Sequence, residues 1–278
     1  MKLHTCIWYN NNAQEAVKLY REAFGDVEVL SDSGMVVMFS VKGTTLMGLN
    51  GGDQFAPTPA FSFYIACADA TEAEKAWTTL AREGKPLMPL GKYDWNENFG
   101  WIADKYGVNW QIWTGEFSQP DQKVVPGLMY CGPVQGRAEE AIHYYTELFK
   151  NASKGMMAHY PADASGIGGQ VMHAEFTLEN MLFKAFDSGV PQPFTFSEGV
   201  SIVIPCDSQE EIDRFWNRFT QDGGGESMCG WCHDKFGVWW QVIPAILPEL
   251  MGDPERGPRV IQAFMKMKKF DIQALLEA

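Results

Sequence analysis

One fifteen-residue stretch occurs twice, and its two copies constrain the fold more than any other feature of the chain. The first copy, residues 99–113, reads FGWIADKYGVNWQIW, and the second, residues 229–243, reads CGWCHDKFGVWWQVI. Gly-Trp, Asp-Lys-aromatic-Gly-Val and Trp-Gln recur in one register. Each copy predicts a strand, a turn in which glycine takes a positive φ, and a second strand. Such a repeat predicts a duplicated supersecondary unit.

The first copy closes a segment in which one order of elements occurs twice. Apolar runs predict strands, and apolar residues three and four apart predict helices. The first unit has strands at 2–9, 27–30, 35–41 and 44–49 and a helix at 13–24. The second has strands at 61–67 and 85–90, a helix at 71–82 and a polar loop at 93–99 before the hairpin. Asn12 and Glu15 predict a capping box, and Gly25 predicts the end of the first helix.

The same order returns in the second half of the chain. Residues 138–149 repeat residues 13–24, and residues 201–206 repeat residues 62–67. We therefore predict an α+β fold of tandem βαβββ units that form two similar domains, with a C-terminal helix. The predicted parts are a first domain at 1–115, a linker at 116–126, a second domain at 127–247 and a helical tail at 248–278.

Composition excludes several classes of partner. The net charge of −13 argues against nucleic acid and anionic membrane surfaces, which select basic proteins. No apolar run reaches the 18 residues of a membrane span, and the N-terminal strand carries no signal-peptide hydrophobic region. We expect a cytoplasmic protein whose six cysteines are reduced thiols.

The repeated units resemble the vicinal oxygen chelate superfamily, the glyoxalase/bleomycin-resistance/dioxygenase fold. The motifs Asn50-Gly-Gly, Cys229-Gly-Trp, Asp234-Lys-Phe-Gly-Val and Trp240-Gln are similar to its PhnB-like branch, often labelled 3-demethylubiquinone-9 3-methyltransferase. The resemblance implies sheets that curl into open cups, and it implies a homodimer. The methyltransferase label finds no support, since no first strand leads through a glycine-rich turn into a helix.

The resemblance also implies where metal-using relatives place their ligands. The implied positions, on the first strand, the end of the fourth strand and the last strand, hold His4, Asn50, Gln111, Met129, Asp187 and Gln241. Glutamine stands at both positions where glutamate is expected. A divalent site needs about three side-chain ligands, with anionic ones for catalysis. We therefore predict no metal and no cofactor.

Tryptophans concentrate on the first and last strands, which line the cup in relatives. Aromatic walls with a few amides suit a flat or apolar small molecule. We predict that the ligand-binding residues are His4, Trp8, Asn50, Trp101, Gln111, Asp187, Trp231 and Gln241. The alternative is that the rings fill the core and the domain interface. Asp104 and Asp234 lie in the repeated turns and are predicted to cap them.

The segment Cys229-Gly-Trp-Cys-His233 has the spacing of a thioredoxin-like redox pair and of a haem c attachment sequence. A redox pair needs a helix N-terminus to lower the thiol pKa, whereas the repeat places this segment on a strand. Haem attachment requires export, and the first copy of the repeat has no cysteine. We expect neither activity.

Two functional hypotheses remain, and the sequence leaves open whether the chain is an enzyme. One is a metal-independent protein that binds a small apolar or aromatic molecule, as bleomycin-resistance relatives do by sequestration. The other is a lyase, isomerase or dioxygenase with a divalent site around His4 or Asp187. The missing carboxylates favour the first hypothesis. A third possibility is that one domain serves only dimerisation.

Overall fold

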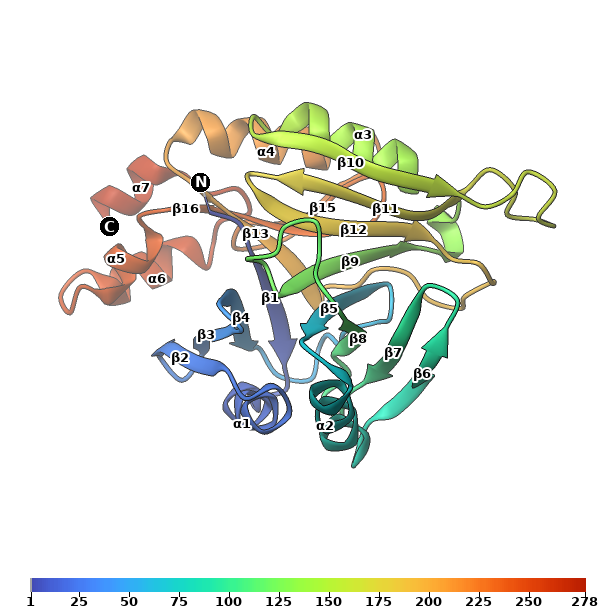
Figure 1. Ribbon diagram of the computed structural model, residues 1–278. Helices are drawn as coiled ribbons and strands as arrows, with labels where there is room; N and C mark the ends of the chain where they lie inside the picture. The colour runs from blue at the N-terminus through green and yellow to red at the C-terminus, as the bar shows by residue number, and fades with distance from the viewer. Residues whose placement is uncertain (1) are drawn as a thin grey trace. The chain divides into compact units, whose positions relative to one another are not determined.

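The structure is a computed structural model that describes residues 2–278, and the chain forms two compact units (Figure 1). The larger unit comprises residues 5–200. The smaller unit comprises residues 201–278 and the N-terminal residues up to His4. The elements of both units follow the strand–helix–three-strand order that the sequence repeats predict.

The first repeat forms a four-strand segment covered by a helix. It consists of β1 (His4–Tyr9), α1 (Ala13–Phe24), β2 (Val27–Asp32), β3 (Val36–Val41) and β4 (Thr44–Asn50). β1 runs parallel to β4, and β3 pairs antiparallel with β4 and β2. Ala16, Tyr20 and Phe24 recur at helical spacing and are buried, so α1 packs through one apolar stripe. Gly25, with φ of 80°, ends the helix as predicted.

The second and third repeats together build one eight-stranded sheet. Its strand order is β10-β11-β12-β9-β5-β8-β7-β6. The elements of the second repeat are β5 (Phe61–Cys67), α2 (Ala70–Ala81), β6 (Lys85–Tyr93), β7 (Asn96–Ala103) and β8 (Asn109–Thr114). Those of the third are β9 (Val124–Tyr130), the 3₁₀ turn η1 (Gly132–Val134), α3 (Ala138–Leu148), β10 (Ala152–His159), β11 (Val171–Leu178) and β12 (Met181–Asp187). The antiparallel pair of β5 and β9 joins the two repeats.

The two faces of this sheet differ in chemistry. Helices α2 and α3 cover one face, where Trp77 lies against Gly100 and Tyr145 stacks on Phe176 at 6.3 Å. Successive side chains of a strand point to opposite faces of the sheet. The residues that alternate with those under the helices therefore share the other face, which we call the inner face. In the strand registers the inner face holds Ser62, Tyr64, Trp101, Gln111, Gly127, Glu175 and Lys184.

A single aspartate explains the repeated hairpin motif in the larger unit. Asp104 Oδ1 accepts hydrogen bonds from the backbone N–H groups of Tyr106 (2.8 Å) and Val108 (3.0 Å). Asp104 Oδ2 accepts from the Trp110 indole at 3.1 Å and from the Tyr20 hydroxyl at 2.8 Å. The motif thus encodes a turn whose aspartate also holds a tryptophan of the next strand. The predicted capping role is confirmed.

The smaller unit contains the fourth repeat and the tail. The repeat consists of β13 (Val200–Cys206), α4 (Gln209–Thr220), β14 (Gly225–Glu226), β15 (Trp231–His233) and β16 (Trp239–Pro244). β13 runs parallel to β16, which pairs antiparallel with β15. Asp234 repeats the role of Asp104, since it accepts from the N–H groups of Phe236 and Val238 and from the Trp240 indole at 2.8 Å.

The tail differs from the single predicted helix. It forms three short helices, α5 (Leu247–Gly252), α6 (Gly257–Phe264) and α7 (Ile272–Glu277). Pro254 follows the end of α5, and proline cannot continue a helix. Asp271 caps α7 by accepting from the Ala274 N–H at 3.0 Å. Between them, the Met267 carbonyl accepts from the Cys229 N–H at 2.7 Å, which ties the tail to the repeated hairpin.

The α+β fold class of tandem βαβββ units is confirmed, with two local corrections. The expected loop at 93–99 is wrong, because β6 runs to Tyr93 and β7 begins at Asn96. Asn96 donates to the Thr114 carbonyl at 2.9 Å, which fastens this polar hairpin to β8. Asn12 makes no side-chain cap; the distant Asn50 caps α1 instead.

The boundary between the two compact units differs from the boundary between the sequence repeats. The compact units divide at residues 200 and 201, whereas the predicted domains divide the sequence repeat at 116–126. The pairing of β5 with β9 crosses those residues, so the larger unit contains three repeats.

No helix among residues 2–278 combines the length and apolar character that a membrane crossing requires.

Candidate functional site on the inner face

A buried ion pair lies at the centre of the inner face. Lys184 on β12 stands directly opposite Glu175 on β11, and its Nζ lies 3.0 Å from a Glu175 carboxylate oxygen. The Lys184 side chain is 3% exposed and that of Glu175 is 11% exposed. Burial lowers the pKa of Lys184, and the nearby Glu175 carboxylate opposes that shift. The Glu175 carboxylate therefore favours the ammonium form of this buried lysine.

Three aromatic rings surround this ammonium group. Lys184 Nζ lies 5.0 Å from the ring centre of Tyr64, 5.1 Å from that of Trp113 and 5.0 Å from that of Phe117. These distances are within the range of cation–π attraction. The rings and Glu175 together replace the water that an exposed ammonium group would hold.

The charges of the ion pair also shift the pKa values of Glu175 and of the nearby His173. Burial alone would raise the pKa of Glu175, but a hydrogen bond from Ser118 and the Lys184 charge lower it overall. His173, two residues earlier on the same strand, has its pKa lowered to about 4 by burial and then by the Lys184 charge. The histidine is therefore neutral at pH 7, and the cluster carries one positive and one negative charge.

Next to the ion pair, the inner face carries amide and hydroxyl groups on β5 and β8. Gln111 Nε2 donates to Ser62 Oγ at 2.8 Å, and Gln111 stands opposite Tyr64 in the register of β5 and β8. Burial raises the pKa of the Tyr64 hydroxyl. Trp101 pairs with Gln111 across the strands and donates through its indole to Asn109 Oδ1 at 3.2 Å. The structure thus brings together two of the predicted residues, Trp101 and Gln111.

Gly127 leaves room for the Tyr64 ring. A Cβ at this position would lie 2.7 Å from Tyr64 Cε2 and 3.0 Å from Ser62 Oγ. We expect Gly127→Ala to push the Tyr64 ring off Lys184 and to lower the free energy of unfolding by about 1–3 kcal/mol. Gly91→Ala, where the added Cβ meets nothing within 4 Å, is the control. Urea unfolding measures both, and equal stability of the two variants would contradict the packing described here.

Asn50 and Asp187 occupy equivalent places, but they serve the helices. Asn50 Oδ1 accepts from the Ala13 N–H at 2.9 Å, at the start of α1. Asp187 Oδ1 accepts from the Ala138 N–H at 3.1 Å, at the start of α3, and its Oδ2 accepts from the Val171 N–H at 2.9 Å. Burial raises the pKa of Asp187 and these backbone donors oppose the shift. Both side chains therefore cap helices on the helix-covered side, and the structure does not bring them together with Gln111.

His4 and Trp8 share one face of β1. The Trp8 indole donates to the Gly52 carbonyl at 2.8 Å, and its ring meets Phe55 edge-on at 4.9 Å. His4 is half-buried, and burial lowers the pKa of its imidazole.

The smaller unit repeats the amide–hydroxyl pair. Gln241 Nε2 donates to Ser201 Oγ at 2.9 Å, as Gln111 does to Ser62. Trp231 lies 6.5 Å from Trp239 between ring centres. Both glutamines thus occupy the same place in their hairpins, although a ligand role for either remains a prediction.

The donor set does not fit a divalent metal. Among residues 2–278 no group of three histidine, cysteine, aspartate or glutamate side chains converges. On the inner face, Gln111 and Ser62 are neutral, and the Lys184 ammonium would repel a cation. We therefore derive no step through a metal ion.

The Cys229 and Cys232 pair lacks the features of a redox centre. No disulfide joins cysteines of residues 2–278. Cys229 lies in a turn, with φ of 56°, rather than on the strand that the repeat predicts. Burial raises the pKa of both thiols, that of Cys232 well above its ordinary value. Nucleophilic thiols need the opposite shift.

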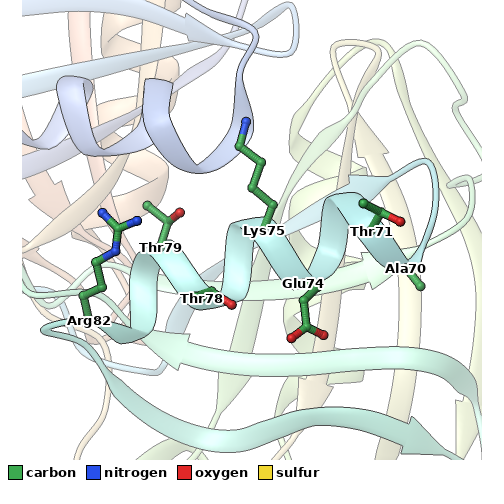
Figure 2. A pocket seen from close by; sticks show the side chains of 7 residues that line it. All are labelled: Ala70, Thr71, Glu74, Lys75, Thr78, Thr79 and Arg82. Carbon is green, nitrogen blue, oxygen red and sulfur yellow. The ribbon is translucent and has the colours of Figure 1, made fainter.

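A separate hollow lies on α2, away from the inner face. A shallow groove of about 590 Å³ runs along the outer side of α2 (Figure 2), lined by Thr71, Glu74, Lys75, Thr78 and Arg82 among others. α2 covers the face opposite the inner face, so none of the predicted ligand-binding residues lines this groove. Its charged, flexible side chains offer no convergent polar groups.

Sequence reasoning missed Lys184, Tyr64 and Phe117. Lys184 is the one charge in the otherwise apolar strand 181–186, and a charge at such a position indicates a buried partner. Phe117 was hidden because its segment carries no apolar periodicity and is typical of a linker. Only the strand register could place these residues together.

Comparisons with known proteins identify the family. The sequence profile of the family described as 3-demethylubiquinone-9 3-methyltransferase matches residues 1–113 and again residues 122–243. A solved structure described as a putative 3-demethylubiquinone-9 3-methyltransferase, PhnB protein, from Bacillus cereus is 31% identical and covers 41% of this chain and 100% of its own, with a TM-score of 0.39. Protein PA1353 from Pseudomonas aeruginosa is 23% identical over 40% of this chain and 96% of its own, with a TM-score of 0.35.

Glyoxalase I from Zea mays is similar in fold. It is 14% identical and covers 88% of this chain and 93% of its own, with a TM-score of 0.58. A search among curated proteins found no match. The double profile match covers both halves of the sequence repeat. The chain therefore belongs to the family described as 3-demethylubiquinone-9 3-methyltransferase.

Proposed function

We propose that this protein binds a small aromatic or apolar molecule on the inner face without a divalent metal. The observation that carries the proposal is the buried Lys184 ammonium group, held by Glu175 and three aromatic rings in the middle of that face. Rings supply apolar contact area, and a few fixed polar groups orient a ligand.

Charge argues against the metal-dependent alternative. A divalent cation beside Lys184 would be repelled, and the neighbouring Gln111 is a neutral amide whose Nε2 donates to Ser62 Oγ at 2.8 Å. Asp187, the carboxylate of the alternative site, uses both oxygens to accept backbone N–H groups. Among residues 2–278, no cluster of three histidine, cysteine, aspartate or glutamate side chains around His4 or Asp187 supports the lyase, isomerase or dioxygenase hypothesis.

Methyl transfer is not part of the proposal, although the family description names it. β1 and β5 lead into α1 and α2 through Asn10–Asn12 and through Ala68 and Asp69, without glycine. Both turns place polar side chains where a nucleotide-binding turn would need bare backbone.

Binding can be tested with Gln111 variants. A panel of fluorinated phenols, benzoic acids and anilines is titrated against the full chain, and ¹⁹F line broadening reports binding. We expect Gln111→Ala to weaken the best probe about tenfold, because a lost hydrogen bond costs about 1–1.5 kcal/mol. Gln241→Ala examines the equivalent group, and Gln273→Ala on the exposed side of α7 is the control. Unchanged affinity in both of the first two variants removes these glutamines from the site.

A further inference from the structure

A segment of the chain itself lies on the Lys184 cluster. Residues 115–123 have no regular structure, and Phe117 is their one large buried side chain, at 6% exposure. Its ring stands 5.0 Å from Lys184 Nζ. The next residue, Ser118, helps to lower the pKa of Glu175 through its side-chain hydroxyl group. One exposed loop therefore places a ring against Lys184 and a polar group beside Glu175.

The loop is held at its ends rather than along its length. At one end the Gly115 N–H donates to the Cys67 carbonyl at 3.1 Å. At the other end Gln122 accepts from the Leu182 N–H at 2.8 Å and donates to the Leu182 carbonyl at 3.0 Å. Glu116 and Ser118 on either side of Phe117 are exposed. The Phe117 ring can therefore leave the cluster while both anchors stay in place.

We propose that Phe117 and Ser118 are a built-in occupant of a binding site for phenol-like molecules, which displace them from Lys184 and Glu175. The aromatic ring of the ligand replaces the Phe117 ring on the ammonium group. Its hydroxyl group donates to Glu175, as Ser118 does. A ring without a donor would leave the buried carboxylate with an unmet acceptor, so the site selects for the hydroxyl group.

The proposal rests on the proposed function. It specifies the class of ligand and how that ligand reaches the Lys184 cluster. Displacing the loop lowers the apparent affinity, because only the open fraction of molecules binds. Removing the Phe117 ring therefore strengthens binding. A simple hole left by that ring would also accept apolar molecules, but without preference for a hydroxyl group.

The test compares 4-fluorophenol with fluorobenzene by ¹⁹F titration. The proteins are the wild type, Phe117→Ala and Phe196→Ala. Phe196 is 7% exposed and packs on Tyr130, so its removal makes a comparable hole away from Lys184. A fourth protein combines Phe117→Ala with Lys184→Met and Glu175→Leu, which removes the ion pair. Hydrogen exchange of residues 115–123 is followed in the wild type with and without 4-fluorophenol.

We expect Phe117→Ala to bind 4-fluorophenol about tenfold more tightly than the wild type and to prefer it about tenfold over fluorobenzene. Phe196→Ala keeps the wild-type affinity for 4-fluorophenol, without the gain of Phe117→Ala, and the protein without the ion pair shows no preference. In the wild type, 4-fluorophenol speeds exchange in residues 115–123.

Three results would overturn the proposal. One is equal affinity of Phe117→Ala for both probes, and another is wild-type binding that leaves exchange in residues 115–123 unchanged. The third is a wild type that does not bind 4-fluorophenol. If other aromatic probes still bind the wild type through Gln111, the proposed function stands, and the proposal that phenols displace the loop is wrong. If no aromatic probe binds any of the proteins, both fail.

Discussion

Glu175→Ala is expected to lower the free energy of unfolding by about 3–5 kcal/mol, because it leaves the Lys184 ammonium group buried without a counter-charge. Lys184 is nearly inaccessible to water and lies 3.0 Å from the Glu175 carboxylate. The three surrounding rings attract the ammonium group, but they do not replace a full negative charge. Urea unfolding at pH 7 measures the loss.

The double variant Glu175→Leu with Lys184→Met separates charge burial from packing. We expect it to regain most of the lost stability, since apolar side chains of similar size need no partner. Glu97→Ala breaks the exposed Lys92–Glu97 pair, whose side chains are both 72% exposed, and serves as the control with a change of about 0.5 kcal/mol or less. A double variant as unstable as Glu175→Ala would show that packing, rather than charge, holds the cluster.

Asp104→Ala is expected to cost about 3–5 kcal/mol, because it leaves several buried donors without an acceptor. Asp104 accepts from the Tyr106 and Val108 N–H groups, the Trp110 indole and the Tyr20 hydroxyl. Tyr20 in turn meets the Tyr9 hydroxyl at 2.9 Å, so the loss extends into α1 and β1. Denaturation followed by tryptophan fluorescence checks the value, and a cost below about 1 kcal/mol would contradict the network.

The same carboxylate gives stability a pH dependence of known sign. Burial raises the pKa of Asp104 from 3.8 to about 6, although the hydrogen bonds it accepts oppose that shift. The folded protein therefore holds this proton more tightly than the unfolded chain does. Its contribution to stability is complete below pH 3.8 and is lost as pH rises through 6, by up to about 3 kcal/mol. Asp104→Asn is expected to flatten the stability profile between pH 4 and 6, and an unchanged profile would contradict the shift.

The sequence predicts the hairpin chemistry well because all of its determinants are local. Asp104 and its turn lie within seven residues, and the same spacing recurs at Asp234. Gly25 and the strand alternation are similarly local. Asn50 shows the opposite case: it caps α1 from a strand 37 residues away, so the local capping box of Asn12 was the wrong inference.

The inner face could be predicted only in part, because it depends on the register of six strands. Trp101 and Gln111 were found because they belong to the repeat. Lys184 and Glu175 have meaning only as a pair, and their opposition on β11 and β12 depends on the turn that joins those strands. Phe117 lies in a segment whose composition indicates a linker, and its contact with Lys184 is a tertiary feature.

The most direct test of metal-independent binding on the inner face is a titration of the purified full chain with 4-fluorophenol. The protein is divided into a portion dialysed against a chelator and an untreated portion, and plasma mass spectrometry measures the metal content of both. We predict equal affinity in the two portions and loss of binding when the Lys184–Glu175 pair is replaced by methionine and leucine. Binding that disappears with the chelator and returns with a divalent metal would contradict the account.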